Sequence, residues 1–197
     1  MNQLQIQTWF QSFAQEIIAQ QEYLSDLDNA IGDGDHGYNM AKGLQIYLET
    51  RESKQDLNLA GEFKLLGMTL LAKVGGASGP IYSSAFLAMA KQLDGLAELD
   101  DSKLGELLEI GLKAIMQRGK AVLGEKTLVD VWTPVIQDMK RQQLTKETVA
   151  AYVERTKDLK ATKGRASYLG ERSIGHIDPG SCSSGILFAK MLDAIAL

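Results

Sequence analysis

The chain has 197 residues, of which 45% are hydrophobic and 23% charged, and its formal net charge is −4. This length is enough to bury a core and is typical of one domain, so we expect residues 1–197 to form a single domain. Lys and Arg are spread along an acidic chain rather than gathered on a basic face, so nucleic acid is not an expected partner.

Signals for a membrane or an oxidising compartment are not evident in the sequence. The segment from Met1 to Gln7 lacks the basic and apolar stretches of a signal peptide, and no apolar run approaches the ~20 residues of a membrane span. The single cysteine, Cys182, has no partner for an internal disulfide, and one Cys with two His is too few for a typical zinc site. We therefore expect a cytoplasmic protein with no membrane partner, in which Cys182 is a packing residue.

Apolar residues recur at helical spacing through most of the chain, and no segment alternates convincingly as a strand does. The predicted helices run in chain order over residues 6–17, 40–48, 63–74, 81–93, 104–115, 131–139, 149–156 and 186–195. Because no repeat or linker separates them, these helices must pack on one another. The sequence thus predicts an all-α fold, an antiparallel bundle or barrel of about eight helices.

The connections between the predicted helices are of two kinds. Those at one end are short polar turns, such as Glu52 to Leu57. The others hold 12 of the 19 glycines and both histidines, and they span residues 25–37, 75–80, 118–130 and 161–181. Successive helices of an up-and-down bundle run antiparallel, so these four connections emerge at the same end, where we expect the functional site.

Three carboxylates, those of Asp28, Asp33 and Asp35, lie within eight residues in the first of these connections. Two carboxylates about 4 Å apart repel each other by roughly 1 kcal/mol in water, and by several times that at an effective dielectric of about 20, so a counter-charge is needed. Oxygen ligands in a glycine-rich loop favour Mg²⁺. A calcium loop is disfavoured, because Leu44 stands at the twelfth position from Asp33, where a glutamate is required. The alternative is that Asp33 and Asp35 only cap the following helix.

Glycine-rich segments precede two further predicted helices. The amides of Gly75 to Pro80, at the positive end of a helix, could bind phosphate. The segment is not a Walker A motif, since no Lys-Ser or Lys-Thr follows the glycines, and such a pattern can also be a simple turn. Asp178 to Ser181 fits two interpretations equally well, a turn with a helix cap or a second set of amides facing a nucleotide.

The long connection over residues 161–181 also carries basic side chains. Arg165 and Arg172 could bind phosphate there or be ordinary surface residues. His36 adjoins the carboxylates and could touch a nucleotide, whereas we expect His176 to be a hydrogen-bonded loop residue. Neither histidine has a convincing Ser or Cys partner for a nucleophilic dyad, so we assign no catalytic side chain.

Five segments together resemble the L-type, nucleotide-binding domain of the dihydroxyacetone kinases. They are Asp28–Gly37, Gly75–Gly79, Arg118–Ala121, Gly164–Tyr168 and Gly175–Gly180, and they follow the family's order over the full length of the chain. The resemblance implies an eight-helix barrel with ADP or ATP at one end and two Mg²⁺ ions held by Asp28, Asp33 and Asp35. By the same resemblance, the nucleotide-binding residues are His36, Gly37, Tyr38, Asn39, Ala77, Ser78, Gly119, Thr127, Leu128, Arg165, Asp178, Pro179 and Gly180. One departure is Ser181-Cys182, where the family usually has a small apolar residue.

The resemblance further implies a phosphotransferase that is one subunit of a larger enzyme. The family's substrate domain is absent from these 197 residues, so a partner subunit would hold dihydroxyacetone. In the phosphotransferase-system version, bound ADP is rephosphorylated by a phosphohistidine protein that draws on phosphoenolpyruvate, and transfer depends on metal and nucleotide positioning. Two alternatives remain open, the nucleotide domain of an ATP-dependent acyl (fatty-acid) kinase and a non-enzymatic, ADP-sensing interaction module.

Overall fold

The computed structural model describes residues 1–54 and 57–197, and within these residues the chain forms helices and no strand. The helices are α1 (Gln3–Ala19), α2 (Gln21–Ile31), α3 (His36–Glu52), α4 (Leu59–Lys73), α5 (Ser78–Ala90), α6 (Asp101–Gly119), α7 (Val129–Lys140), α8 (Lys146–Arg155), the 3₁₀-helices η1 (Thr156–Asp158) and η2 (Arg165–Ser173), and α9 (Pro179–Ile195). The predicted all-α class is confirmed. Residues 55 and 56, which belong to the predicted turn from Glu52 to Leu57, lie outside the described part of the chain.

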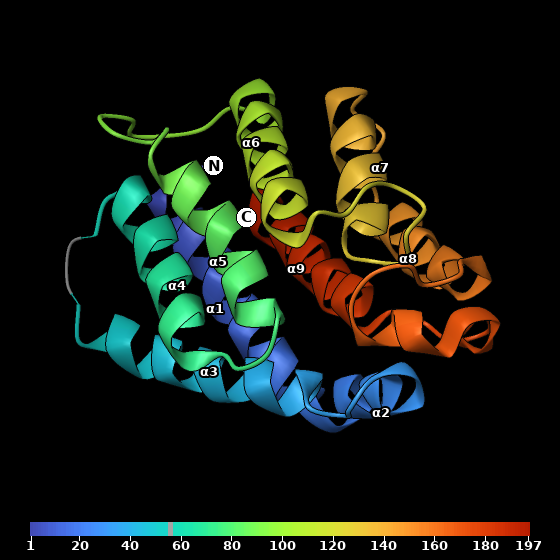
Figure 1. Ribbon diagram of the computed structural model, residues 1–197. Coiled ribbons are helices and arrows are strands. Elements are labelled where there is room, and N and C mark those ends of the chain that lie inside the picture. Colours follow the sequence, from blue (N-terminus) through green and yellow to red (C-terminus); the bar gives the residue numbers. More distant parts are fainter. Residues whose placement is uncertain (55–56) are drawn as a thin grey trace.

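Eight of the α-helices form a closed ring (Figure 1). From α3 to α9 each helix packs against the next one along the chain, and α9 packs against α1, which in turn contacts α3. These eight are the helices that the apolar pattern predicts, so the barrel is confirmed. The ring closes without α2, which extends from the end of α1 and lies against α3.

Aromatic side chains from different parts of the sequence fill the ring. The rings of Phe10 on α1 and Phe63 on α4 lie 4.8 Å apart between centroids, and those of Phe10 and Phe86 on α5 lie 5.5 Å apart, both edge to face. On the other side, Trp132 of α7 meets Phe188 of α9 at 4.9 Å. All five side chains are fully buried, and they belong to one continuous hydrophobic core.

The predicted connection over residues 25–37 is wrong in its first part, because α2 continues to Ile31. The chain bends at Gln20 without a glycine or proline. The Gln20 amide donates to the Glu16 carbonyl, while the Leu24 amide donates to the Gln20 carbonyl, so the backbone hydrogen bonds continue through the bend. Asp28 therefore lies on the last turn of a helix and not in a loop.

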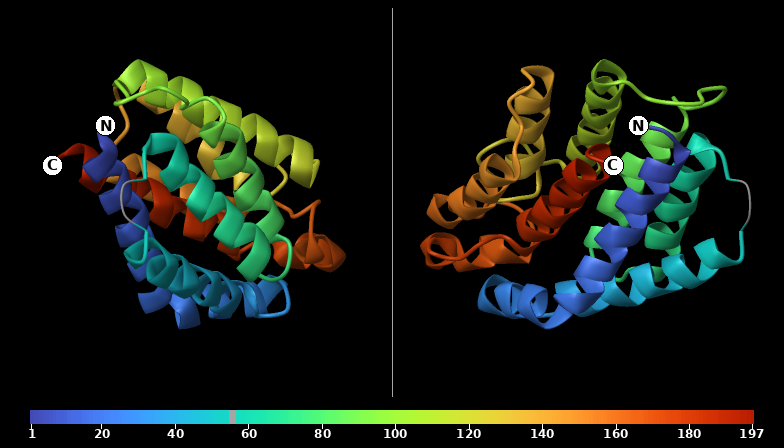
Figure 2. Two further views of the ribbon diagram at one scale, coloured as in Figure 1. Left: turned by 90° about the vertical axis from the view of Figure 1, so that its left-hand side faces the viewer. Right: turned by 180° about the vertical axis from the view of Figure 1, so that it is seen from behind.

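The two ends of the ring differ in how their helices begin. At the end that holds both termini (Figure 2), the α-amino group of Met1 donates to the Leu99 carbonyl. Side chains cap the four helices that start at this end, namely Asn2 for α1, Asn58 for α4, Asp100 for α6 and Thr145 for α8. At the opposite end the N-cap side chains of α3, α5 and α7 make no capping bond, and only that of α9 does. Residues outside the N-cap position accept amides of α3 and α7, whereas the first amides of α5 remain free to bind something else.

None of the described helices combines the length and apolar character needed to cross a lipid bilayer.

Candidate metal and nucleotide site

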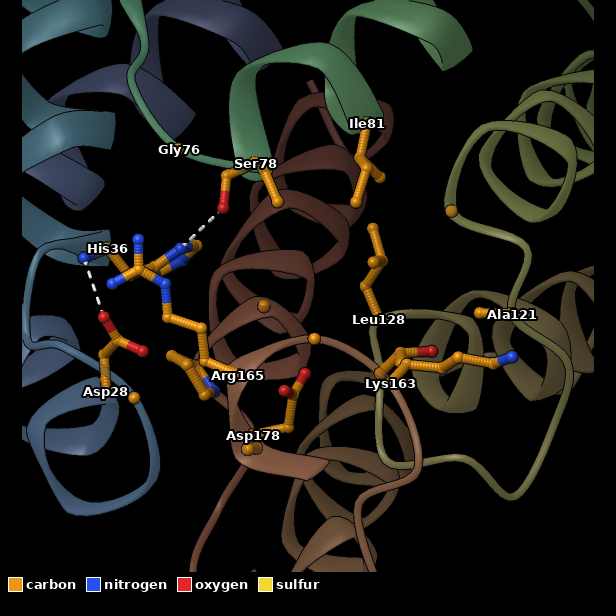
Figure 3. A pocket seen from close by; sticks show the side chains of 18 of the residues that line it. Asp28, His36, Gly76, Ser78, Ile81, Ala121, Leu128, Lys163, Arg165 and Asp178 are labelled. Atoms are coloured by element: carbon orange, nitrogen blue, oxygen red, sulfur yellow. Dashed lines mark hydrogen bonds between the residues drawn. The ribbon is translucent and has the colours of Figure 1, made fainter. Parts of the chain in front are cut away.

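A cavity of about 580 Å³ lies at the end of the ring where α3, α5, α7 and α9 begin. Its walls come from the four glycine-rich connections that the sequence places at one end (Figure 3). Thirteen predicted site residues line it, and they are Asp28, Asp33, Asp35, His36, Ala77, Ser78, Gly119, Thr127, Leu128, Arg165, Asp178, Pro179 and Gly180. The structure therefore brings most of the predicted residues into one place.

The three predicted metal ligands form a cluster at one side of this cavity. Asp28, Asp33 and Asp35 each offer a carboxylate oxygen, and the three oxygens lie within 4.8 Å of one another. Such a group of oxygen ligands fits a hard divalent cation such as Mg²⁺. The guanidinium of Arg165 forms an ion pair with Asp33, so one cation already faces the cluster.

The helix-capping alternative for Asp33 and Asp35 is not what the structure contains. Asp35 occupies the N-cap position of α3, yet its side chain makes no capping bond. Instead, Oδ2 of Asp28 accepts the amide of Asp35 at 2.9 Å and that of His36 at 3.1 Å (Figure 3). Asp28 thus fixes the backbone of the loop, which leaves the carboxylates of Asp33 and Asp35 without a capping role.

Two glycines are required by the geometry of the loop over residues 32–35, between α2 and α3, which we call the carboxylate loop. A Cβ at Gly32 would lie 2.1 Å from Oδ1 of Asp28, and Gly34 has a φ of +76°, a conformation that other residues rarely adopt. Larger residues would displace Asp28 or strain the turn. These positions explain why the loop between α2 and α3 is rich in glycine.

A second wall of the cavity is the connection from Val74 to Ser78, which leads into α5. Gly76 has a φ of +67°, and a Cβ at Gly79 would meet the Val74 carbonyl at 2.3 Å, so the chain turns tightly before the helix. Ala77, the N-cap residue, has no side chain that could satisfy the first amides of α5. These amides and the positive helix end suit an anion.

His36 links the carboxylate loop to this second wall and to α9. Its Nδ1 lies 2.9 Å from Oγ of Ser78, and its Nε2 lies 3.0 Å from Oγ of Ser183. The hydroxyl of Tyr82 contacts Ser183 at 2.8 Å and Ser184 at 2.7 Å, which extends the network into the core. Burial lowers the pKa of His36 to about 4, so the imidazole is neutral at neutral pH.

The start of α9 forms a third wall. Asp178 caps the helix by accepting the amide of Ser181 at 2.6 Å, Pro179 takes the first helical position, and the Ser181 hydroxyl donates to the Thr127 carbonyl at 2.9 Å. Burial raises the pKa of Asp178 to about 6. The turn-and-cap interpretation of this segment is confirmed, and the same residues also line the cavity.

Three predicted contact residues do not line the cavity, namely Gly37, Tyr38 and Asn39. They lie in the first turn of α3, where Gly37 faces α2: a Cβ there would be 2.0 Å from the Gln21 carbonyl. The Tyr38 side chain is exposed, and Asn39 lies beside Gly75. The helix turns Gly37 and Tyr38 away from the cavity that His36 enters, whereas Asn39 stays beside Gly75, which lines it. Arg172, exposed on η2, also lies outside the cavity, and exposed His176 offers its carbonyl to Lys126.

The structure adds lining residues to which the sequence analysis gives no role. The basic ones are Arg118, Lys126 and Lys163, and apolar Ile81, Ile115 and Ala121 lie at the other side. Arg118 and Lys163 each adjoin a glycine in one of the predicted connections, so the sequence could have indicated that they line the site. The sequence contains no such indication for Lys126, because its burial depends on segments that are distant in the sequence.

Comparisons with known proteins agree with this geometry. A family model described as the DAK2 domain matches residues 30–193. The chain is 51% identical over 184 residues to a Listeria innocua protein named PEP-dependent dihydroxyacetone kinase 1, ADP-binding subunit DhaL, with 93% of this chain and 92% of that protein covered. It is 49% identical over 188 residues to a Lactococcus lactis protein named PTS-dependent dihydroxyacetone kinase, ADP-binding subunit DhaL, with 95% of each covered. The crystal structure of the native dihydroxyacetone kinase of C. freundii matches with a TM-score of 0.76 at 25% identity, over 98% of this chain and 35% of that chain.

Proposed function

The chain belongs to the DAK2 domain family, and from this premise we propose that it is the nucleotide-binding subunit of a dihydroxyacetone kinase. Relatives at 51% and 49% identity, which this chain covers almost entirely, are named ADP-binding subunits of such kinases. The observation that carries the proposal is the cluster of Asp28, Asp33 and Asp35 beside a cavity of nucleotide size, at the end where helix amides are uncapped. We propose that the 197 residues act as one domain in the cytoplasm.

The carboxylate cluster is the proposed metal site. We propose that Asp28, Asp33 and Asp35 hold two Mg²⁺ ions, which supply positive charge around the phosphates of the nucleotide. Asp28 also orders the loop through its bonds to the amides of Asp35 and His36, so the site is held in shape by the chain itself. The aspartates are metal holders in this proposal and not bases.

The nucleotide would lie across the cavity from this cluster. Ala77 and Ser78, at the uncapped start of α5, are placed for a phosphate, and Arg165 supplies a guanidinium on the same side. Gly119, Thr127, Leu128 and the segment from Asp178 to Gly180 line the rest. His36, neutral and held by two hydroxyls, orients Ser78. We leave Gly37, Tyr38 and Asn39 out of the proposed contact set, because they do not line the cavity.

Two partner proteins follow from the proposal. One subunit holds dihydroxyacetone, and a phosphohistidine protein of the phosphotransferase system recharges the bound ADP from phosphoenolpyruvate, so that the nucleotide acts as a coenzyme. The names of the relatives, PEP-dependent and PTS-dependent, support this donor. Exposed apolar residues beside the cavity, Val122, Leu123, Tyr168 and Ile174, support protein contacts at the mouth. We refer to these four as the apolar rim.

Substitution of one carboxylate tests the site. Asp33→Asn should abolish Mg²⁺-dependent retention of ADP while leaving the helix content unchanged, because it removes one of three charges that hold the cation. Retained nucleotide is identified after denaturation of the purified protein, and helix content is followed by circular dichroism. Asp26→Asn, an exposed aspartate on α2, is the matched control and should retain ADP as the unaltered chain does. Equal retention by Asp33→Asn would defeat the assignment.

A reconstitution assay tests the reaction. The chain is combined with a dihydroxyacetone-binding subunit and supplied with either ATP or the phosphoenolpyruvate-driven phosphohistidine proteins, and dihydroxyacetone phosphate is measured. Product with the second donor, at catalytic amounts of nucleotide, is the expected result. Product with ATP alone would instead indicate an ordinary ATP-dependent kinase. Transfer to a fatty acid, or binding of ADP with no transfer, would favour the acyl-kinase and ADP-sensing alternatives.

A further inference from the structure

Lys126 is a buried cation that the proposed chemistry does not use. Its residue is 1% exposed, although lysine side chains are rarely buried without a specific partner. Its φ is +59°, in the left-handed region that residues with a Cβ seldom occupy. Burial of a charge and an unfavourable backbone conformation at the same residue persist only where the surrounding structure requires them.

The ammonium of Lys126 joins three segments that are far apart in the sequence. Its Nζ donates to the carbonyl of Thr156 at 2.5 Å, where α8 passes into η1, and also to the carbonyl of His176 in the connection before α9. The side chain of Thr156 extends the link, since its Oγ1 accepts the amide of Asp178 at 3.1 Å. Burial lowers the pKa of Lys126, while the nearby carboxylates of Asp178, Asp158 and Asp130 act to raise it.

These bonds tie together two walls of the cavity. Lys126 directly precedes Thr127 and Leu128, and His176 precedes the segment from Asp178 to Gly180. The walls also meet through the Ser181 hydroxyl, which donates to the Thr127 carbonyl at 2.9 Å. The spacing of the two walls is therefore set by the ammonium of Lys126 and the hydroxyls of Thr156 and Ser181, three residues that are at most 1% exposed.

We infer that Lys126 is a positioning residue, which sets the distance between the wall formed by Thr127 and Leu128 and the wall formed by Asp178 to Gly180. The inference rests on the proposed function, because the walls are taken to enclose a nucleotide. Lys126 acts through the two backbone segments and does not bind the nucleotide itself. The metal cluster lies on α2 and the start of α3, which its ammonium does not contact.

The test compares ADP binding and metal binding in the full-length chain. Lys126→Met keeps most of the side-chain volume but leaves two buried carbonyls without a donor. We expect its affinity for ADP in the presence of Mg²⁺ to fall about tenfold, measured by calorimetry, with Mn²⁺ affinity in the absence of nucleotide unchanged. The matched control is Lys157→Met, which removes a surface ammonium that pairs with Glu154 from the same region, and it should bind ADP normally.

Chemical rescue separates positioning from general damage. In a Cys182→Ala background, Lys126→Cys is alkylated with bromoethylamine while unfolded and then refolded, which restores an amine at nearly the original length. Recovery of ADP affinity supports the inference. ADP binding equal to that of the unaltered chain in Lys126→Met, even with a lowered melting temperature, overturns it, as does a parallel loss of Mn²⁺ binding.

A second variant covers the case in which Lys126→Met does not fold. Thr156→Val keeps the carbonyl that accepts from Lys126 and removes the hydroxyl that accepts the Asp178 amide and donates to the Val153 carbonyl. It should also weaken ADP binding with Mn²⁺ binding retained. Normal ADP affinity in that variant would overturn the inference. If the unaltered chain itself fails to bind ADP with Mg²⁺, the proposed function fails first, and this result is distinct from a failure of Lys126 alone.

Discussion

The carboxylate of Asp28 carries out two tasks at once. It belongs to the acidic cluster, and it accepts the two amides that begin α3. The hydrogen bonds hold the loop in the shape that brings Asp33 and Asp35 close to it. Asp28 therefore organises the cluster of which it is itself a member.

The carboxyl group of Asp178 should make the stability of the folded chain depend on pH. Burial raises its pKa from 3.8 to about 6, so the folded state binds the proton more tightly than the unfolded state does. Below pH 3.8 the carboxyl is neutral in both states. Between about pH 3.8 and 6 the unfolded state is ionised while the folded state still holds the proton, so the free energy of unfolding falls across this interval, by no more than about 3 kcal/mol, and is constant above it.

Asp178→Asn removes this titration and keeps an amino acid that caps helices well. The variant should therefore match the unaltered chain near pH 4 and exceed it in stability above pH 6. The measurement is urea unfolding at a series of pH values. A constant difference between the two proteins across that range would show that Asp178 titrates normally.

Residues of the site differ in how far the sequence could identify them. Asp28, Asp33 and Asp35 stand out because three like charges in eight residues need a counter-charge, which is a local property. Lys126 could not be identified, because its burial depends on Thr156 and His176, which only the fold brings near. The sequence likewise could not indicate that Tyr38 does not line the cavity, since the direction of its side chain follows from the helix that begins at His36.

Among the helices, capping of the N-termini differs between the two ends of the ring. Side chains cap the helices at the end with the termini, whereas three of the four helices that begin at the cavity lack a cap from their N-cap residue. At α3 and α7 other residues accept some of these amides, whereas at α5 the first amides stay free, with partial positive charge beside the cavity. The start of α5 is therefore suited to bind an anionic ligand.

The eight helices of the ring were predictable because apolar residues recur at helical spacing in each of them, including α8, which has only 10 residues. α2 was not, since its only fully buried apolar residues are Leu24 and Ile31, and polar Ser25, Asp26 and Asn29 lie between them. The bend at Gln20 carries no glycine or proline that would mark a new helix. The small number of apolar residues in α2, and not an unusual fold, accounts for the missed element.

Close packing between α2 and α3 leads to a prediction for Gly37. A Cβ at this position would lie 2.0 Å from the Gln21 carbonyl, so Gly37→Ala must push the two helices apart. We expect the free energy of unfolding to fall by about 1–3 kcal/mol, and Mn²⁺ affinity to fall as well, because Asp28 and Asp35 lie on the separated helices. Denaturant unfolding and Mn²⁺ titration measure the two effects.

Gly105 on α6 provides the matched control for this substitution. A Cβ there meets only Cγ of Lys140, at an ordinary 3.6 Å. Gly105→Ala should leave Mn²⁺ binding unchanged and stabilise the chain by about 0.5–1 kcal/mol, since alanine favours a helix over glycine. Similar losses in both variants would show that α2 and α3 are not closely packed.

For the whole molecule, Tyr168 of the apolar rim is the most exposed large apolar side chain among the described residues, at 87%. It stands two residues after Ala166, which lines the cavity. An aromatic side chain with that exposure next to a reactive site is typical of a contact with another protein. The proposed transfer to a substrate on a second subunit requires such a contact.

Substitution in the apolar rim should separate binding of a partner from binding of the nucleotide. Tyr168→Ser is expected to raise the KM for the dihydroxyacetone-binding subunit about tenfold, the order of magnitude of an aromatic hot spot, with ADP affinity unaltered. Leu4→Ser, at an exposed position on the first turn of α1, should change neither value. An unchanged KM in Tyr168→Ser would place the docking surface elsewhere.

The closure of the ring without α2 has a consequence for how this protein can change over evolutionary time. The ring holds the large aromatic core, whereas Asp28 lies on α2, which adds Leu24 to that core but is not one of the helices that close the ring. The aromatic residues of the core and the carboxylates of the cluster are therefore different residues. Substitutions at exposed positions of the metal loop, such as Asp33, can accumulate with little loss of stability, which eases the compromise between activity and stability that constrains many enzymes.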